Sequence, residues 1–256
     1  MQKLPQITRI TRMDINQICV HLRNLWLCIL FFICGINYSQ TDAHTLYLSA
    51  LAKDSVKDYT GALSDLDNAL ANAKNNDSLH ILHAKIEAES LNFKEAYAEI
   101  NEIIKHNTTS SDAYLLRGII RAKLGNLEGA VHDFTKSLKL NSINSKAYYN
   151  RGLAHAYLDE FKKAVDDFSK AIELTPAYAD AWFQRGYWKE AMKDYNGSLT
   201  DLIKANELNP NNTEILIETA VVNYKLKQND KACALLSDAK TKGSSSAGEL
   251  ILIYCK

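Results

Sequence analysis

Glycine and proline are scarce in this chain, which has 10 glycines and 3 prolines among 256 residues. All-β and loop-rich proteins normally use more of both, because tight turns depend on them. An excess of either charge is also lacking, since 30 basic residues stand against 30 acidic ones. Surfaces that bind nucleic acid are usually strongly basic. These shortages argue against an all-β fold and against a nucleic-acid partner.

Recognised catalytic motifs are absent as well: the chain has no GxSxG, HExxH, glycine-rich phosphate loop or CxxC. The best metal candidate is the set His80, His83 and Glu87, in which His83 and Glu87 stand one helical turn apart. Such a spacing can hold zinc on a helix. However, no second cluster of ligands accompanies it, and helix-packing residues would show the same pattern. We therefore predict a protein that is not an enzyme and uses no metal or cofactor.

The N-terminal segment, residues 1–40, differs in character from the rest of the chain. Basic residues precede an uninterrupted apolar run, Leu25 to Ile36, and small or polar residues follow it. This order is typical of a secretory signal peptide, and the run is short for a membrane-spanning helix, which needs about 20 residues. We predict that residues 1–40 are a signal peptide cleaved near Ser39, with a retained N-terminal membrane anchor as the alternative. Either way the protein is exported, to the periplasm or the outside, and touches a membrane only through this segment if it is uncleaved.

Two cysteines lie outside this segment, Cys233 and Cys255. In an oxidising compartment they could form a disulfide between two C-terminal helices. The interpretation that we favour is a pair of thiols packed between helices.

One pattern recurs at a constant interval, without insertion, from Ala43 to Ser246. Positions 8 and 20 of every copy carry Gly, Ala or Ser, position 27 does so in five copies, and position 24 carries Leu, Ile or Phe. Small residues allow two helices to approach closely, and a large apolar residue fills the space beside the contact. Breaks fall near positions 15–17 and 31–34, where residues such as Pro176 and Pro210 cannot continue a helix. Each copy therefore predicts a helix, a tight turn and a second helix.

This pattern resembles the tetratricopeptide repeat family, in which a helix-turn-helix unit recurs every ~34 residues. The resemblance is strongest in repeats three to five, which carry an aromatic residue at position 4 and glycine at position 8, whereas repeats one, two and six depart at positions 4 and 32. It implies an all-α fold, a right-handed α-α superhelix (solenoid) of six helix-turn-helix repeats. Their predicted ranges are 43–76, 77–110, 111–144, 145–178, 179–212 and 213–246. Residues 247–256 are predicted to form a C-terminal capping helix, because a solenoid end would otherwise expose an apolar face.

A recurring arginine at position 7 has two interpretations. In three copies an aspartate follows it at position 23, which gives the pairs Arg117 and Asp133, Arg151 and Asp167, and Arg185 and Asp201. The arginines could form a row that grips a ligand. We favour a structural ion pair between helices, because a half-buried arginine normally has a partner.

The resemblance also implies a binding surface. In the family, the first helix of each repeat lines a concave groove, and positions 2, 5, 9, 12 and 13 face into it. In repeats four and five these positions supply the candidate protein-binding residues Tyr149, Tyr157, Phe183, Tyr187, Lys146 and Glu190. Aromatic side chains on such a face are typical binding anchors. The alternative is that some of them pack between neighbouring helices.

Three functional hypotheses follow from these features. The first is an exported, non-catalytic scaffold or adaptor that binds a protein or peptide partner in the groove. The second is a self-associating structural component of an envelope assembly. The third is a metal-dependent enzyme built on His80, His83 and Glu87.

Overall fold

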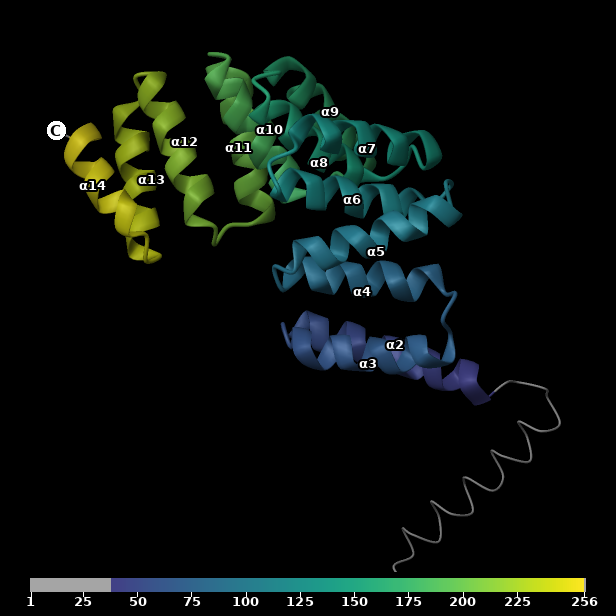
Figure 1. Ribbon diagram of the computed structural model, residues 1–256. Helices are drawn as coiled ribbons and strands as arrows, with labels where there is room; N and C mark the ends of the chain where they lie inside the picture. The colour runs from purple at the N-terminus through teal and green to yellow at the C-terminus, as the bar shows by residue number, and fades with distance from the viewer. Residues whose placement is uncertain (1–37, 256) are drawn as a thin grey trace, which may run out of the picture. The chain divides into compact units, whose positions relative to one another are not determined.

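The computed structural model describes residues 38–255, and this part of the chain folds into helices with no strand (Figure 1). The predicted signal peptide or anchor lies outside the described residues, except for Tyr38–Gln40 at the start of the first helix. None of the described helices combines the length and the apolar character that crossing a membrane requires. The fold class is thus the predicted one, an all-α superhelix of helical repeats.

The helices that the sequence predicts as the first of each repeat begin at nearly constant intervals along the chain. Five of them, α4, α6, α8, α10 and α12, begin at position 1 of their copies and so keep the interval of the sequence pattern. The helix α2 differs, because it begins at Tyr38, before Ala43. The bounds of this set are α2 Tyr38–Ser55, α4 Asp77–Glu89, α6 Ser111–Lys123, α8 Ser145–Tyr157, α10 Ala179–Ala191 and α12 Thr213–Lys225.

The second helices also follow the period, and a polar residue often fixes where they begin. Asp58, Asn126 and Asp194 each accept a hydrogen bond from the backbone N–H three residues further on. Such a cap satisfies one of the N–H groups that the first turn of a helix leaves without a partner. The second helices are α3 Tyr59–Asn72, α5 Phe93–His106, α7 Leu127–Leu140, α9 Phe161–Leu174, α11 Tyr195–Leu208 and α13 Asn229–Thr241.

The turn between the two helices of a repeat has the same backbone form each time. Position 15 takes a positive φ in all six copies, although only one of them has glycine there. Glycine adopts this left-handed conformation without strain, and other residues adopt it at some cost. The residues concerned are Lys57, Leu91, Gly125, Asp159, Lys193 and Lys227.

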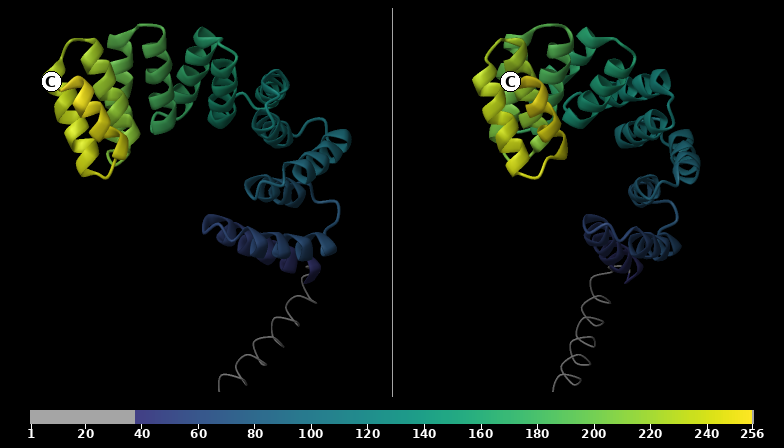
Figure 2. Two further views of the ribbon diagram at one scale, coloured as in Figure 1. Left: turned by 60° about the vertical axis from the view of Figure 1, so that its left-hand side comes forward. Right: turned by 90° about the vertical axis from the view of Figure 1, so that its left-hand side faces the viewer.

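The chain divides into two compact units, with the boundary between Ile86 and Glu87 inside α4. In the first unit, α2, α3 and α4 enclose a core that includes Ala50, Leu66 and Leu82. The second unit contains α5 to α14. There each helix packs against the next one along the chain, both within a repeat and from one repeat to the next (Figure 2).

Close packing in the second unit depends on glycine at position 8. A methyl group on Gly118 would lie 2.6 Å from Phe134, and one on Gly152 would lie 2.8 Å from Phe168. Both phenylalanine side chains are fully buried. The prediction that small residues at this position let the helices meet is confirmed.

The C-terminal end of the second unit is closed by α14, Ser245–Tyr254, which packs on α13 through Ala247, Leu250 and Ile251. A disulfide joins Cys233 in α13 to Cys255, just after α14, and their Cα atoms are 5.6 Å apart. Our interpretation of these two cysteines as packed thiols is therefore wrong. The chain reversal after α13 brings both sulfur atoms to one edge of the two helices, and one-dimensional spacing does not show this.

Candidate functional site

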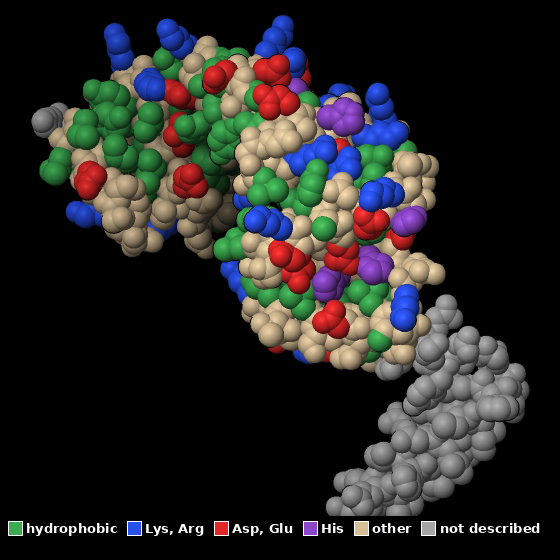
Figure 3. Space-filling model, in the orientation of Figure 1, with side chains coloured by type: hydrophobic (Ala, Val, Ile, Leu, Met, Phe, Trp, Pro, Cys, Tyr) green, Lys and Arg blue, Asp and Glu red, His purple; other side chains and the backbone are tan. Residues whose placement is uncertain are grey.

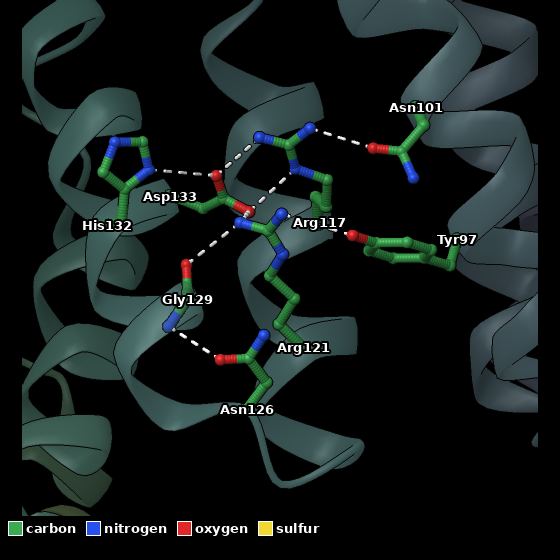
Figure 4. A network of polar contacts seen from close by, with 8 residues as sticks. All are labelled: Tyr97, Asn101, Arg117, Arg121, Asn126, Gly129, His132 and Asp133. Atoms are coloured by element: carbon green, nitrogen blue, oxygen red, sulfur yellow. Dashed lines mark hydrogen bonds and ion pairs between the residues drawn. The ribbon is translucent and has the colours of Figure 1, made fainter.

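The recurring arginines form bidentate ion pairs inside their own repeats. Nε and Nη2 of Arg117 donate hydrogen bonds to the two carboxylate oxygens of Asp133, at 2.8 and 2.7 Å (Figure 4). The same two bonds, at the same distances, connect Arg151 with Asp167 and Arg185 with Asp201. The prediction of a structural ion pair is confirmed. Asp133 also raises the pKa of Arg117 above its ordinary value.

Each arginine also reaches the preceding repeat, and the sequence interpretation missed this contact. Nη1 of Arg117 donates a hydrogen bond to Asn101 at 2.9 Å. Nη1 of Arg151 donates to Thr135 at 3.2 Å, and Nη1 of Arg185 donates to Ser169 at 3.1 Å. These three acceptors all stand at position 25. Recurrence of a polar residue at this position was the signal that could have revealed them. Each arginine thus ties three helices together.

Other side chains complete the network around each carboxylate. At position 11, Arg121 and Lys189 approach Asp133 and Asp201 to 2.8 Å. At position 4, an aromatic ring lies 4.7 to 5.5 Å from each position-7 guanidinium, a distance at which rings attract cations. We name this repeated network of position-7 arginine, position-23 aspartate and position-25 polar side chain the arginine ladder. Each nitrogen of the three position-7 guanidinium groups donates a hydrogen bond within the protein, so the arginines serve structural contacts.

The predicted groove residues lie on α8 and α10 and divide into exposed and packed side chains. Tyr157 and Tyr187 reach solvent, with 69% and 40% of their surface exposed. Phe183 is only 9% exposed and packs in a core cluster with Leu202 and Ile215. Packing between helices, the alternative to groove binding, therefore describes Phe183.

Tyr149 lies between these extremes. Its ring centroid is 5.8 Å from that of Phe168 and 4.9 Å from that of Tyr178. Burial raises its pKa well above the usual range, and the nearby carboxylate of Asp180 adds to the effect. Burial also raises the pKa of Tyr178, to about 12. Burial thus disfavours the phenolate form of both side chains.

The two charged candidates differ in their surroundings. Lys146 is exposed near the start of α8. Glu190, at the end of α10, forms an ion pair with Lys225 of α12. This pair joins the first helices of repeats five and six. One further carboxyl group, Glu218 in α12, was not among the candidates, and burial, together with Glu214, raises its pKa.

The proposed metal ligands have other partners. Nε2 of His80 lies 2.9 Å from the carbonyl oxygen of Lys74, and Nε2 of His83 lies 3.5 Å from a carboxylate oxygen of Asp67. Glu87 accepts a hydrogen bond from the side chain of Asn92. Among residues 38–255, no group of three or more His, Cys, Asp or Glu side chains is arranged to hold a metal ion. The geometry thus gives the metal hypothesis no support.

Models of the tetratricopeptide repeat match three consecutive copies, residues 111–144, 145–178 and 179–212. The chain contains three tetratricopeptide repeats, which together span residues 111–212. Repeats of this family support a role as a scaffold that binds other proteins. The matched copies are the three that carry the arginine ladder.

Solved structures share the fold of this protein at low sequence identity. A tetratricopeptide repeat protein from Parabacteroides merdae is 19% identical with a TM-score of 0.61, over 80% of this chain and 81% of that one. MamA from Desulfovibrio magneticus RS-1 is 20% identical with a TM-score of 0.60, over 64% and 93%. YrrB, described as a repeat protein with an unusual peptide-binding site, is 19% identical with a TM-score of 0.58, over 70% and 92%. No curated protein sequence matches the chain.

Proposed function

We propose that this protein is an exported, non-catalytic scaffold that binds a protein or an extended peptide on the first helices of repeats four and five. The observation that carries the proposal is the exposure of two aromatic side chains on these helices, Tyr157 on α8 and Tyr187 on α10. Tyrosine combines a large apolar area with a polar tip, and it is common among the residues that dominate binding energy at protein interfaces. The peptide-binding site named for YrrB lies on a similar fold and supports the same kind of role.

Photo-crosslinking followed by affinity measurement tests this proposal. A photoreactive amino acid in place of Tyr187 should give a discrete adduct with the partner in cells, and mass spectrometry then identifies the partner. The same photoreactive amino acid in place of Ile143 serves as the control, because Ile143 is exposed in the turn before α8. The variant Tyr157→Ala/Tyr187→Ala should then bind the purified partner at least about tenfold more weakly, because loss of an interface anchor typically costs more than about 1 kcal/mol. Unchanged affinity in a variant of unchanged helicity would remove the assignment of this surface.

Export is the second part of the proposal. It is supported by the signal-like order of residues 1–40 and by the disulfide between Cys233 and Cys255, because disulfides persist mainly in oxidising compartments. Mass spectrometry of the protein from its native cells should find a new N-terminus near Gln40 and no free thiol at Cys233. An intact N-terminal segment together with two reduced cysteines would contradict export.

Self-association remains the second candidate function, and one feature of α14 favours it. Leu252 and Ile253 of this last helix are 71% and 60% exposed, and hydrophobic side chains gather over the C-terminal helices in Figure 3. Exposed apolar surface at the end of a repeat array is suited to a protein contact. Light scattering decides: a mass that rises with protein concentration supports self-association, and a monomer at every concentration contradicts it.

A further inference from the structure

The arginine ladder stops at repeat six. Position 7 is Thr219 there, and position 23 is Leu235. The preceding position 25 is Ile203, where repeats two to four have Asn, Thr or Ser. Thr219 and Asn223 are buried, and each donates its side-chain hydrogen bond to a backbone carbonyl of its own helix, at 2.6 and 2.8 Å. The polar side chains of α12 on this face therefore do not tie it to α11 as the arginines tie the earlier repeats.

A cavity of about 400 Å³ lies between α11, α12 and α13, where the ladder of repeat six would be. Its lining includes Leu199, Ile203, Asn206, Thr219, Asn223 and Leu235. Three of these residues occupy the ladder positions, so the cavity corresponds to the space that an arginine side chain crosses in repeats three to five. Cavities of this size are within the range of known ligand sites.

Two features of the lining define what the cavity can hold. Leu199, Ile203 and Leu235 contribute apolar surface to it. Ile203 is 49% exposed, so apolar surface continues from the cavity to its mouth. Glu207 and Lys231 add one charge of each sign to the lining.

We propose that this cavity is a binding site for a leucine or methionine side chain of an extended peptide segment in a partner protein. The side chain occupies the space of the absent arginine and packs on Leu199, Leu235 and Ile203. The acceptors of the ladder are absent here, because Leu235 and Ile203 stand where its aspartate and its polar residue would be.

This site is separate from the surface assigned under the proposed function. Thr219 and Asn223 point away from Ile217 and Val221, which hold positions 5 and 9 of α12, by roughly half a turn of helix at about 100° per residue. Loss of Tyr157 and Tyr187 on α8 and α10 therefore leaves this cavity unchanged. Either proposal can fail without the other.

The first test is an NMR titration of the isotope-labelled full chain with three capped amino acids. N-acetyl-leucinamide offers an apolar side chain and amide N–H groups, N-acetyl-glycinamide offers the N–H groups alone, and N-acetyl-argininamide offers the residue of the ladder. We expect saturable shifts of the Ile203 and Leu235 methyl signals with the leucine probe, and at least tenfold weaker binding of the other two. Absence of saturable binding of the leucine probe, or equal binding of the arginine probe, would overturn the proposal.

Variants that follow the chain's own pattern provide the second test. Thr219→Arg/Leu235→Asp/Ile203→Ser rebuilds the ladder in repeat six and should weaken binding of the leucine probe at least tenfold, because the new arginine fills the cavity. Should this triple variant lose helicity, Ile203→Glu takes its place, since that side chain is half exposed and its replacement spares the core. Ile143→Glu, at an exposed site outside the cavity, is the matched control and should bind as the unmodified chain does. Unchanged binding by the cavity variants would refute the site.

Discussion

At the scale of single residues, the arginine ladder contributes more to the arrangement of the helices than to their net stability. A buried ion pair loses most of its attraction to the cost of removing both charges from water. Its directional hydrogen bonds nevertheless hold one geometry, and each guanidinium here joins its own repeat to the one before. Removal of one partner is costly, because the other charge then stays buried without compensation.

Two adjacent aspartates of α9 allow a direct test of this cost. Asp167 receives two hydrogen bonds from Arg151, and Asp166 beside it is exposed. We expect Asp167→Asn to lower the free energy of unfolding by about 3 kcal/mol. The matched change Asp166→Asn should alter it by less than about 0.5 kcal/mol. Chemical denaturation followed by circular dichroism measures both, and equal effects would show that the ion pair is dispensable.

Sequence spacing was sufficient to predict the pairing of these residues but not the whole network. The constant interval from position 7 to position 23 places an arginine of a first helix opposite an aspartate of the second, because the register of the two helices is set within one repeat. Contacts of Arg117 with Asn101 and of Arg121 with Tyr97, at 2.9 and 3.2 Å, cross to the preceding repeat. They depend on how repeats stack, and spacing within one repeat does not determine that.

At the scale of helices, glycine has opposite roles in α8 and α14. Gly152 of α8 faces the buried ring of Phe168, whereas nothing lies within 4 Å of a methyl group placed on Gly248 of α14. Helix propensity favours alanine over glycine by about 1 kcal/mol at both places. At Gly152 the contact with Phe168 makes the net change in stability unfavourable, because overpacking a core costs about 1–3 kcal/mol.

Gly152→Ala should therefore destabilise the protein by about 1 kcal/mol, and Gly248→Ala should stabilise it by about 0.5–1 kcal/mol. Thermal unfolding of the two variants measures the difference. Stabilisation by both changes would mean that Phe168 moves aside freely, and would contradict the account of position 8 as a site of required close approach.

At the scale of the whole molecule, the C-terminal end is held by a covalent bond as well as by packing. The disulfide between Cys233 and Cys255 closes a loop with a sequence separation of 22 residues. By the chain-entropy relation, a loop of this length corresponds to about 3 kcal/mol of stability. The helix α14 buries only Ala247 fully, and Leu250, Ile251 and Tyr254 pack partly buried against the same core cluster, so the disulfide reinforces a small packing contact.

Cys233→Ser/Cys255→Ser should loosen α14 first. We expect hydrogen exchange of the amides of α14 to rise at least about tenfold, while exchange in α8 and α9 stays nearly unchanged, because each repeat of such an array contacts chiefly its neighbours. Mild reduction of the unmodified protein should produce the same change and reoxidation should reverse it. Equally faster hydrogen exchange along the whole chain would instead indicate that the disulfide stabilises the whole array.

The sequence by itself determined the all-α class, the constant step of the helices, the close contacts at position 8 and the arginine–aspartate pairs. All four are properties of one repeat, and repetition makes them visible. Only the tertiary structure decided that Tyr157 is exposed while Phe183 is buried, that two cysteines form a bond, and that a cavity replaces the ladder in repeat six. The physical reason is that burial of a side chain depends on residues from the neighbouring repeats, and the period of the sequence does not specify those contacts.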